Sequence, residues 1–259
     1  MPISLPVDDE ANELLSRNAL ALLIAMLLDR HVQKNCSWAD DPFGLPPEML
    51  PGTAEWLRAH RTPGRPQMAI SLPVDDEANE LLSRSALALL IGMLLDQQVP
   101  LERAFSAPRD LVRRLGHEPA ADELAEFDPE ALAAVFSERP ALHRFPKAMA
   151  ARTQELARLI VAEYGGDAAA LWTTAPSGTE LRKRAAALPG FGEAKAKIFV
   201  ALLGKQLGVR PPGWREAAGS FGDEGSYVSV ADIVDAESLG KVRSYKQTLK
   251  AAAKAKAAQ

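Results

Sequence analysis

The sequence predicts an all-α fold, on three observations. Alanine and leucine are abundant while aromatic residues make up only 6% of the chain, a composition that suits helices. Apolar residues recur at helical spacing, and no segment of any length alternates as a strand would. A short Pro-Gly-x-Gly turn, Pro189 to Gly192, also separates a polar helical stretch from an apolar one, as a hairpin between two helices would.

The first part of the chain nearly duplicates a later part. Residues 1–30 and 68–97 differ only at Pro2/Ala69, Asn18/Ser85, Ala25/Gly92 and Arg30/Gln97. A near-identity that occurs twice indicates a partial duplication rather than a solenoid. The extra copy must pack on the outside, pair with another chain or stay loose.

The repeat and the composition together divide the chain into three parts. Residues 1–67 hold the partial duplicate and a linker rich in proline and glycine. Residues 68–240 are the predicted helical domain. Residues 241–259 form a tail rich in lysine and alanine, which is either a solvated end or an electrostatic arm for DNA.

The first half of the helical domain reads as a series of helices. Asp75 is a predicted N-cap, as is Asp8 in the duplicate. Asp128 and Pro129 open another helix as N-cap and first helical residue. Gly165 and Gly166 end a long helix. The predicted helices cover residues 86–95, 101–105, 108–115, 130–136 and 146–164.

The second half is expected to contain the hairpin and a change of pattern after it. Residues 219–225 read as a loop, and residues 228–234 are compatible with either a strand or a helix. The tail from Leu239 is a helix former. The remaining predicted helices cover residues 167–172, 178–187, 193–207 and 214–218.

The hairpin carries the strongest chemical signal. Gly190 and Gly192 let the backbone take φ > 0 and come close to whatever lies outside. The helix that follows starts with free N–H groups, which form a ready anion site. Such a motif can hold a nucleic-acid phosphate by its main chain, although a tight turn between two packed helices would look the same.

The stretch Leu188 to Ala196 resembles the helix-hairpin-helix motif of the HhH-GPD superfamily of base-excision DNA glycosylases. The resemblance covers about residues 72–218 and includes two further patches in the expected order, residues 89–99 and 143–150. It implies that the N–H groups of Gly190, Gly192 and Ala194 bind a phosphate of double-stranded DNA. Lys195 and Lys197 would add charge, and nearby carbonyls could hold a structural monovalent cation.

The resemblance also implies a residue that fills the gap left when the damaged base is flipped out. Extruding a base costs unstacking energy, and a short amide can hydrogen-bond the orphaned partner base. Gln97 and Gln98 are the candidates for this wedge, and a helix C-terminus with no such role is the alternative. The duplicate has Arg30 and His31 instead.

Two departures from the family pattern concern catalysis. Bifunctional members carry a nucleophilic lysine at the position that Ala194 occupies in this sequence. Lys195 is the next residue, and on a helix its side chain is rotated by 100° from that position. Strand cleavage through a Schiff base is therefore not supported. No aspartate occupies Pro212 to Trp214, where the family carries its catalytic one, so Glu216 is the nearest catalytic candidate. Trp214 would line a base pocket or belong to the core.

Charge and composition limit the partners and cofactors. The net charge is −4, but residues 181–259 carry 14 basic and 7 acidic side chains, so the part with the hairpin is basic. The single cysteine, Cys36, excludes a disulfide framework and a four-cysteine iron–sulfur cluster. The four histidines show no metal spacing. We expect no cofactor and no metal.

The location and assembly of the protein are less constrained. The longest apolar run, residues 19–28, is too short to span a bilayer, and the acidic N-terminus is unlike a signal peptide. We therefore expect a cytoplasmic protein without a membrane partner. The oligomeric state is left open.

Three functions are compatible with these observations. The first is a monofunctional glycosylase that flips a damaged base and hydrolyses its N-glycosidic bond. The second is a non-catalytic protein of the same fold that binds DNA lesions or structures, favoured by the missing aspartate. The third is a helical protein-interaction module that uses the hairpin for packing.

Overall fold

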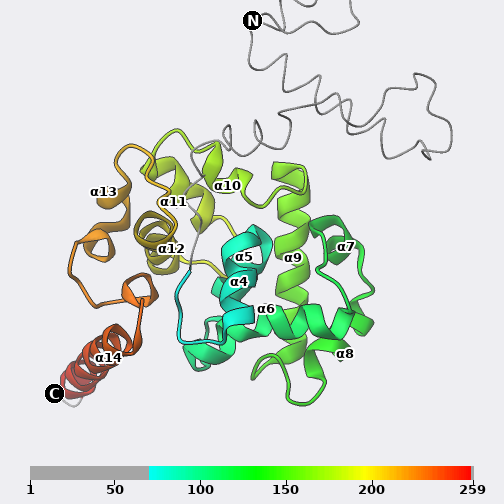
Figure 1. The fold of residues 1–259 in the computed structure, drawn as a ribbon, viewed down its shortest axis with the longest axis horizontal. Helices are drawn as coiled ribbons and strands as arrows, with labels where there is room; N and C mark the ends of the chain where they lie inside the picture. The colour runs from blue at the N-terminus through cyan, green and yellow to red at the C-terminus, as the bar shows by residue number, and fades with distance from the viewer. Residues whose placement is uncertain (1–69, 258–259) are drawn as a thin grey trace, which may run out of the picture. The chain divides into compact units, whose positions relative to one another are not determined.

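The computed structural model describes residues 70–257. The duplicate copy with its N-cap candidate Asp8, the linker and Cys36 lie outside these residues. Every regular element between residues 70 and 257 is a helix, which confirms the all-α prediction (Figure 1). Within that range the helices form two groups. They lie on either side of the C-terminal end of α5 (Ala86–Leu95), a buried apolar helix.

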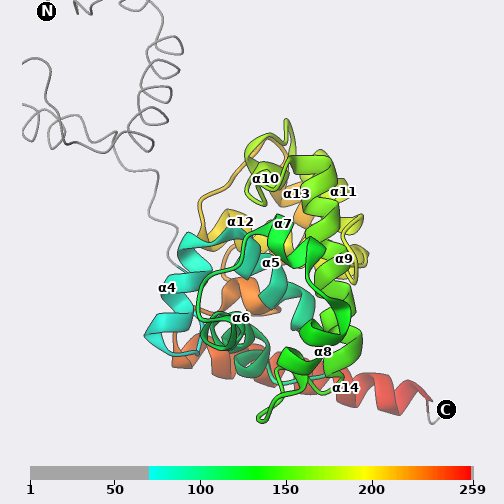
Figure 2. The ribbon, with the colours of Figure 1, turned by 90° about the vertical axis from the view of Figure 1, so that its right-hand side faces the viewer.

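The first group runs from residue 70 to Gly166. Its long last helix, α9, packs against α7 and α8, while α5 packs against α4 and α6. Figure 2 shows α9 behind the shorter helices α7 and α8. The helices of this group are α4 (Asp76–Arg84), α5 (Ala86–Leu95), α6 (Leu101–Leu115), α7 (Ala121–Glu126), α8 (Pro129–Ser137) and α9 (Pro146–Tyr164).

Helix α5 is the centre of the first group. Every side chain from Ala88 to Leu95 is buried, and the Ser85 hydroxyl caps the helix by accepting from the Ala88 N–H. A Cβ at Gly92 would lie 3.0 Å from the Phe105 ring of α6. The two helices can therefore approach closely only because this position is glycine. The C-terminal end of α5 points to the second group.

The second group is built around α12. Helices α11 and α13 and the 3₁₀ turns η2 and η3 all pack against it. Helix α14 continues from η3 and projects beyond the other described helices (Figures 1 and 2). The elements of this group are α10 (Ala170–Thr173), α11 (Gly178–Ala186), α12 (Glu193–Gln206), α13 (Trp214–Ala218), η2 (Gly219–Gly222), η3 (Val230–Asp232) and α14 (Ala236–Ala257).

The local signals in the sequence placed most helix ends correctly. Asp75 and Asp128 are the N-caps of α4 and α8, and each carboxylate accepts a backbone N–H three residues on. Gly165 takes the left-handed conformation after α9 (φ 59°), as predicted for its C-terminal end. The segment 228–234 is neither strand nor α-helix but contains η3. The predicted boundary at residue 241 falls inside α14.

The prediction of two helices around Pro108 was wrong. Helix α6 is continuous from Leu101 to Leu115 with Pro108 inside it. Pro108 cannot donate a hydrogen bond to the turn before it. However, its ring lies on the buried face of α6 with Phe105 and Leu111, and this packing outweighs one missing bond. Helix α7 was missed, since six residues are too few to show a clear period.

Between residues 70 and 257, no single helix is long and apolar enough to cross a bilayer. Helices α4 and α5 satisfy the length and composition criteria only as a pair, and they are bent by 116° to one another.

Candidate nucleic-acid interface

The hairpin between α11 and α12 presents an open main-chain surface. Gly190 has a φ of 73°, and the Phe191 N–H donates to the Leu188 carbonyl at 3.0 Å. The Phe191 ring is buried edge-on against Phe199, 6.0 Å between centroids, which anchors the turn from inside. Gly190, Gly192 and Ala194 are all exposed. The first N–H groups of α12 therefore face outward without intrahelical acceptors.

The two hairpin glycines have different surroundings. A Cβ at Gly190 would lie 2.6 Å from Leu94 Cδ1 and 3.2 Å from Gln97 Nε2, so the turn packs closely on the end of α5. A Cβ at Gly192 would meet no atom within 4 Å. Gly190 is thus required by the protein itself, whereas the space beside Gly192 is open to a ligand.

Gln97 joins three segments that are distant in the sequence. Its Nε2 donates to the Leu94 carbonyl at 2.6 Å, and its Oε1 accepts from Arg152 of α9 at 3.3 Å. Its backbone carbonyl lies 2.8 Å from Nε2 of His143. Together with the contact to Gly190, these bonds connect all three patches that carry the family resemblance. The half-buried Gln97 side chain is therefore fixed by contacts within the protein.

Gln98 has the opposite character. It is exposed, and its φ of 55° is the one positive value at a non-glycine residue among those the structure describes. A left-handed conformation costs an L-residue free energy and is found most often at functional sites. Of the two wedge candidates, the structure leaves Gln98 free to reach a ligand and uses Gln97 to fix the turn.

The patch that precedes α9 adds an apolar side chain to this surface. The backbone N–H of Phe145 donates to Nδ1 of His143 at 3.0 Å, so His143 links Phe145 to the Gln97 turn. The Phe145 ring is 44% exposed, although exposed aromatic rings are uncommon on a soluble protein. The Arg144 guanidinium lies 5.3 Å from its centroid. An apolar ring with a cation above it therefore stands near Gln98.

The two lysines predicted to add charge at the hairpin are placed differently. The ammonium of Lys195 donates to the carbonyls of Met93 (2.7 Å) and Leu94 (3.2 Å), where it caps the C-terminal end of α5. Burial lowers the pKa of Lys195 to about 8, against the attraction of Asp96. Lys197 is half-buried on the next turn of α12. Ala194, the residue before Lys195, is exposed and occupies the outward position.

Asp96 is a candidate that the sequence reasoning missed. It is the C-cap of α5, directly before Gln97, and its carboxylate has no hydrogen bond or ion pair among residues 70–257. Burial raises the pKa of this carboxyl, and attraction by Lys246 of α14 and by Lys195 opposes the shift. A signal was present, because an acidic residue at a helix C-terminus opposes the helix dipole.

Glu216 and Trp214 lie at the other end of α12. The Trp214 ring covers Gly204, where a Cβ would lie 2.3 Å from two ring atoms. Gly204 is nine residues beyond Lys195, which at 1.5 Å per residue is about 14 Å along the helix. Glu216 is exposed, and its carboxylate lies by Gly213 at the start of α13. The structure therefore does not bring Glu216 to the hairpin.

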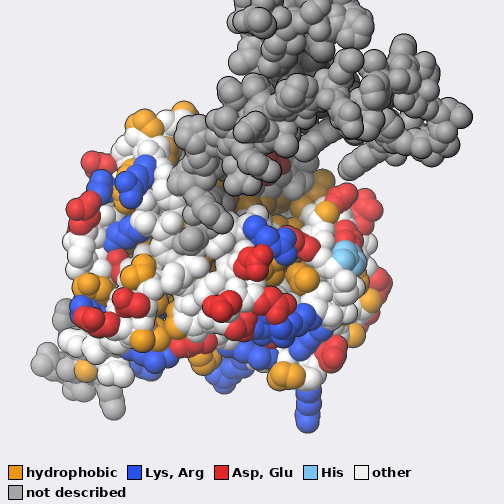
Figure 3. Space-filling view, in the orientation of Figure 1, with side chains coloured by type: hydrophobic (Ala, Val, Ile, Leu, Met, Phe, Trp, Pro, Cys, Tyr) orange, Lys and Arg blue, Asp and Glu red, His pale blue; other side chains and the backbone are white. Residues whose placement is uncertain are grey.

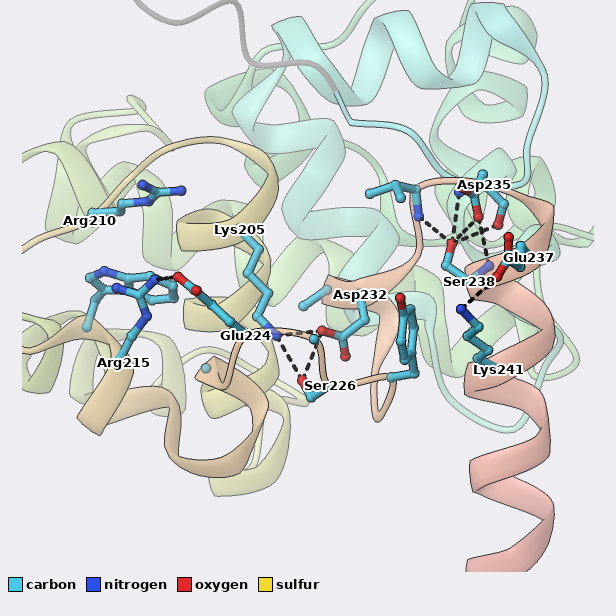
Figure 4. A pocket seen from close by; sticks show the side chains of 16 residues that line it. Lys205, Arg210, Arg215, Glu224, Ser226, Asp232, Asp235, Glu237, Ser238 and Lys241 are labelled. Atoms are coloured by element: carbon cyan, nitrogen blue, oxygen red, sulfur yellow. Dashed lines mark hydrogen bonds and ion pairs between the residues drawn. The ribbon is translucent and has the colours of Figure 1, made fainter.

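Trp214 instead forms part of the wall of a cavity of about 340 Å³ that opens between α12 and the start of α14. The charged side chains around this cavity point toward one another (Figure 4). Lys205 is 2.5 Å from the buried Asp232 carboxylate, Arg215 pairs with Glu224, and Lys241 lies 2.7 Å from Glu237. Their charges are thus already compensated within the protein.

The charge of the surface is mixed on the side seen in Figure 3. Where grey atoms do not cover that face, lysine and arginine side chains alternate with aspartate and glutamate over the described residues. Exposed cations of this region include Arg152, which donates to Gln97, Arg144 and Lys147 of the patch before α9, and Lys246, which attracts Asp96. Anion binding at the hairpin would therefore depend on main-chain N–H groups as well as on these cations.

Comparison with known proteins gives one match. A family model described as HhH-GPD superfamily base excision DNA repair protein matches residues 91–259, well over half of the chain. This span contains Asp96, Gln97, Gln98, the patch before α9 and the hairpin. Comparisons with curated proteins and with solved structures gave no match.

Proposed function

The chain belongs to the HhH-GPD superfamily of base excision DNA repair proteins, and on that premise we propose that it is a monofunctional DNA glycosylase. It would flip a damaged base out of duplex DNA and hydrolyse the N-glycosidic bond. The observation that carries the proposal is the set of contacts made by Gln97. They join the hairpin, the segment with the exposed Gln98 and, through His143, the segment with the exposed Phe145.

The hairpin supplies the phosphate contact in this proposal. The N–H groups of Gly190, Gly192 and Ala194 would bind phosphate oxygens of the strand that carries the damaged base, at the positive end of α12. Arg144 and Lys147 would contact the backbone beside it, and Lys197 would add charge from the next turn of α12. Nearby hairpin carbonyls could also hold a monovalent cation.

Gln98 and Phe145 would replace the base that has left the stack. A flipped base leaves a gap and an unpaired partner, and both cost free energy. The amide of Gln98 can hydrogen-bond the partner base, and the ring of Phe145 can stack on a neighbouring base pair. Both side chains are exposed and are fixed to the same turn through His143.

Hydrolysis by water is favoured over cleavage through an amine. Ala194 offers no nucleophile, and the Lys195 amine is directed to two carbonyls of α5. A non-catalytic lesion-binding protein is the second candidate, because no aspartate lies at Pro212 to Trp214 and Glu216 lies in α13, at the end of α12 away from the hairpin.

The proposal is tested with the full chain on duplexes that carry uracil, hypoxanthine, alkylated adenine or oxidised guanine. After incubation, alkali cleaves any abasic site. A strand break at one lesion that requires alkali identifies a monofunctional glycosylase and its base. A break without alkali contradicts the monofunctional proposal. The absence of any break, together with salt-sensitive binding to the same duplexes, identifies the non-catalytic protein.

Gly192→Ala is expected to weaken binding to duplex DNA about tenfold, or by about 1.4 kcal/mol, without changing stability. The added methyl group meets no protein atom but enters the space through which a phosphate would approach. Fluorescence anisotropy at several salt concentrations measures the affinity, and urea unfolding measures the stability. Unchanged affinity would mean that DNA does not approach this side of the hairpin.

Gln98→Gly is expected to slow base release while raising the free energy of unfolding by up to about 1 kcal/mol, because glycine relieves the left-handed strain. Gln97→Ala is the matched comparison. It should lower the free energy of unfolding by about 1 kcal/mol, since it removes hydrogen bonds that hold the turn. Urea unfolding and single-turnover base release are measured for both variants. Equal effects of the two variants would contradict the structural role of Gln97 and the wedge role of Gln98.

A further inference from the structure

We propose that Asp96 is the carboxylate that activates water for base release, in the place of the aspartate that the loop after α12 lacks. The inference rests on the proposed glycosylase function. It assigns the catalytic carboxylate to the C-terminal end of α5 rather than to α13.

The position of Asp96 is the first reason. It follows the last residue of α5 and precedes Gln97, whose side chain meets Gly190 of the hairpin. Gln98 is two residues away. Consecutive Cα atoms are about 3.8 Å apart, so the backbone of Asp96 adjoins the residue that contacts the hairpin and lies close to the wedge candidate Gln98. Glu216 lies in α13, whose first residue Trp214 covers Gly204, and Gly204 is about 14 Å along α12 from Lys195 by the helix rise.

The surroundings of the carboxylate are the second reason. The Lys195 ammonium of α12 is fixed at the end of α5 by the carbonyls of Met93 and Leu94, and both Lys195 and Lys246 of α14 attract the Asp96 carboxylate. Neither ammonium forms an ion pair with it within 4.0 Å among the described residues. Asp96 is thus half-buried and is attracted by two cations, yet its oxygens form no hydrogen bond or ion pair among the described residues. Such a carboxylate can bind a water molecule or a substrate group without breaking an existing contact.

The chemistry of base release requires such a group. The C1′–N bond breaks, and its electron pair leaves with the base. The oxygen of a water molecule bonds to C1′ while the Asp96 carboxylate accepts the proton from that water. The departing base takes up a proton from solvent and Asp96 returns its proton to solvent, so the products are the free base and an abasic sugar with a hydroxyl at C1′. While the bond breaks, the negative carboxylate also stabilises the positive charge on the sugar.

The charges around Asp96 are suited to this role. Burial makes the carboxylate a stronger proton acceptor than an exposed aspartate, because it raises the pKa of the carboxyl. Lys246 and Lys195 attract the ionised form and oppose this rise in the pKa. The Lys195 ammonium is in turn affected by Arg152 of α9, which lowers its pKa. Base release should therefore fall at acidic pH as Asp96 becomes protonated.

The test compares Asp96→Asn with the wild-type full chain and with Asp122→Asn, an exposed aspartate in the first turn of α7. Single-turnover base release is measured on the lesion that the wild-type protein processes. Asp96→Asn should lower the rate about 100-fold or more. Its affinity for a duplex with a tetrahydrofuran abasic analogue should stay within about twofold of wild type, or about 0.4 kcal/mol. Asp122→Asn should retain the wild-type rate.

Two further measurements separate catalysis from a structural role. Asp96→Glu keeps a carboxylate and should recover part of the activity even if Asp96→Asn is less stable. The acidic limb of the pH–rate profile should disappear in any residual activity of Asp96→Asn. The inference would be overturned if Asp96→Asn released the base at the wild-type rate, or if Glu216→Gln lost activity while Asp96→Asn kept it. Either result would leave the glycosylase function standing. A wild-type protein that releases no base would overturn both.

Discussion

Replacing Gly190 with alanine is expected to lower the free energy of unfolding by about 2–4 kcal/mol and to abolish measurable specific binding to DNA. Two costs combine at this position. The backbone has a φ of 73°, which an L-residue adopts with strain. The new Cβ would also lie 2.6 Å from Leu94 Cδ1 and 3.2 Å from Gln97, so the turn would have to move away from α5.

The matched control for this variant is Gly192→Ala in the same turn. Gly192 has a φ of −97°, and its Cβ position is open, so alanine there should leave stability unchanged. Urea unfolding followed by circular dichroism at 222 nm measures both variants, and anisotropy measures DNA affinity. A Gly190→Ala variant as stable as wild type would show that the hairpin does not pack against the end of α5 as described.

Gly204→Ala is expected to lower the free energy of unfolding by about 2–4 kcal/mol. The cause is a steric clash at the C-terminal end of α12, away from the hairpin. The new methyl group would lie 2.3 Å from two atoms of the Trp214 ring and 2.8 Å from a third. Trp214 is only 7% exposed, so the ring has little free space into which it can move. The loop from Gly208 to Gly213 would therefore be displaced with it.

Gly240→Ala is the control for this second variant. Gly240 also lies within a helix, α14, but a Cβ there meets no atom within 4 Å. Alanine favours helix over glycine by about 1 kcal/mol, so this variant should be slightly more stable than wild type. Urea unfolding again gives the measurement. The same comparison tests the site assignment, because Gly204→Ala should impair DNA binding less than Gly190→Ala does at equal loss of stability. The reverse order would place the interface near Trp214.

Local sequence patterns account for the helical class, most helix boundaries and the position of the hairpin. These features depend on local interactions. Asp75 and Asp128 cap the helices that begin after them, and Gly165 ends α9 because it can take a left-handed φ. The Pro-Gly-x-Gly turn likewise specifies its own geometry from its own residues.

The directions of the side chains at the site were decided by the tertiary structure. Gln97 and Gln98 are chemically identical, and only the contacts with His143, Arg152 and Gly190 make one structural and leave the other exposed. Lys195 was expected at the DNA surface. It is directed inward because the carbonyls at the end of α5 lie within its reach, and those carbonyls belong to residues about one hundred positions earlier.

The same reason explains why Asp96 was missed and Glu216 was selected. Glu216 was selected because it is the carboxylate nearest in the sequence to Pro212–Trp214, where the family resemblance implies an aspartate. In the folded protein α12 carries the chain away from the hairpin, while α5 returns Asp96 to it. Helix formation depends on neighbours in sequence, but a site assembled from α5, α9 and α12 depends on packing between segments that no local pattern encodes.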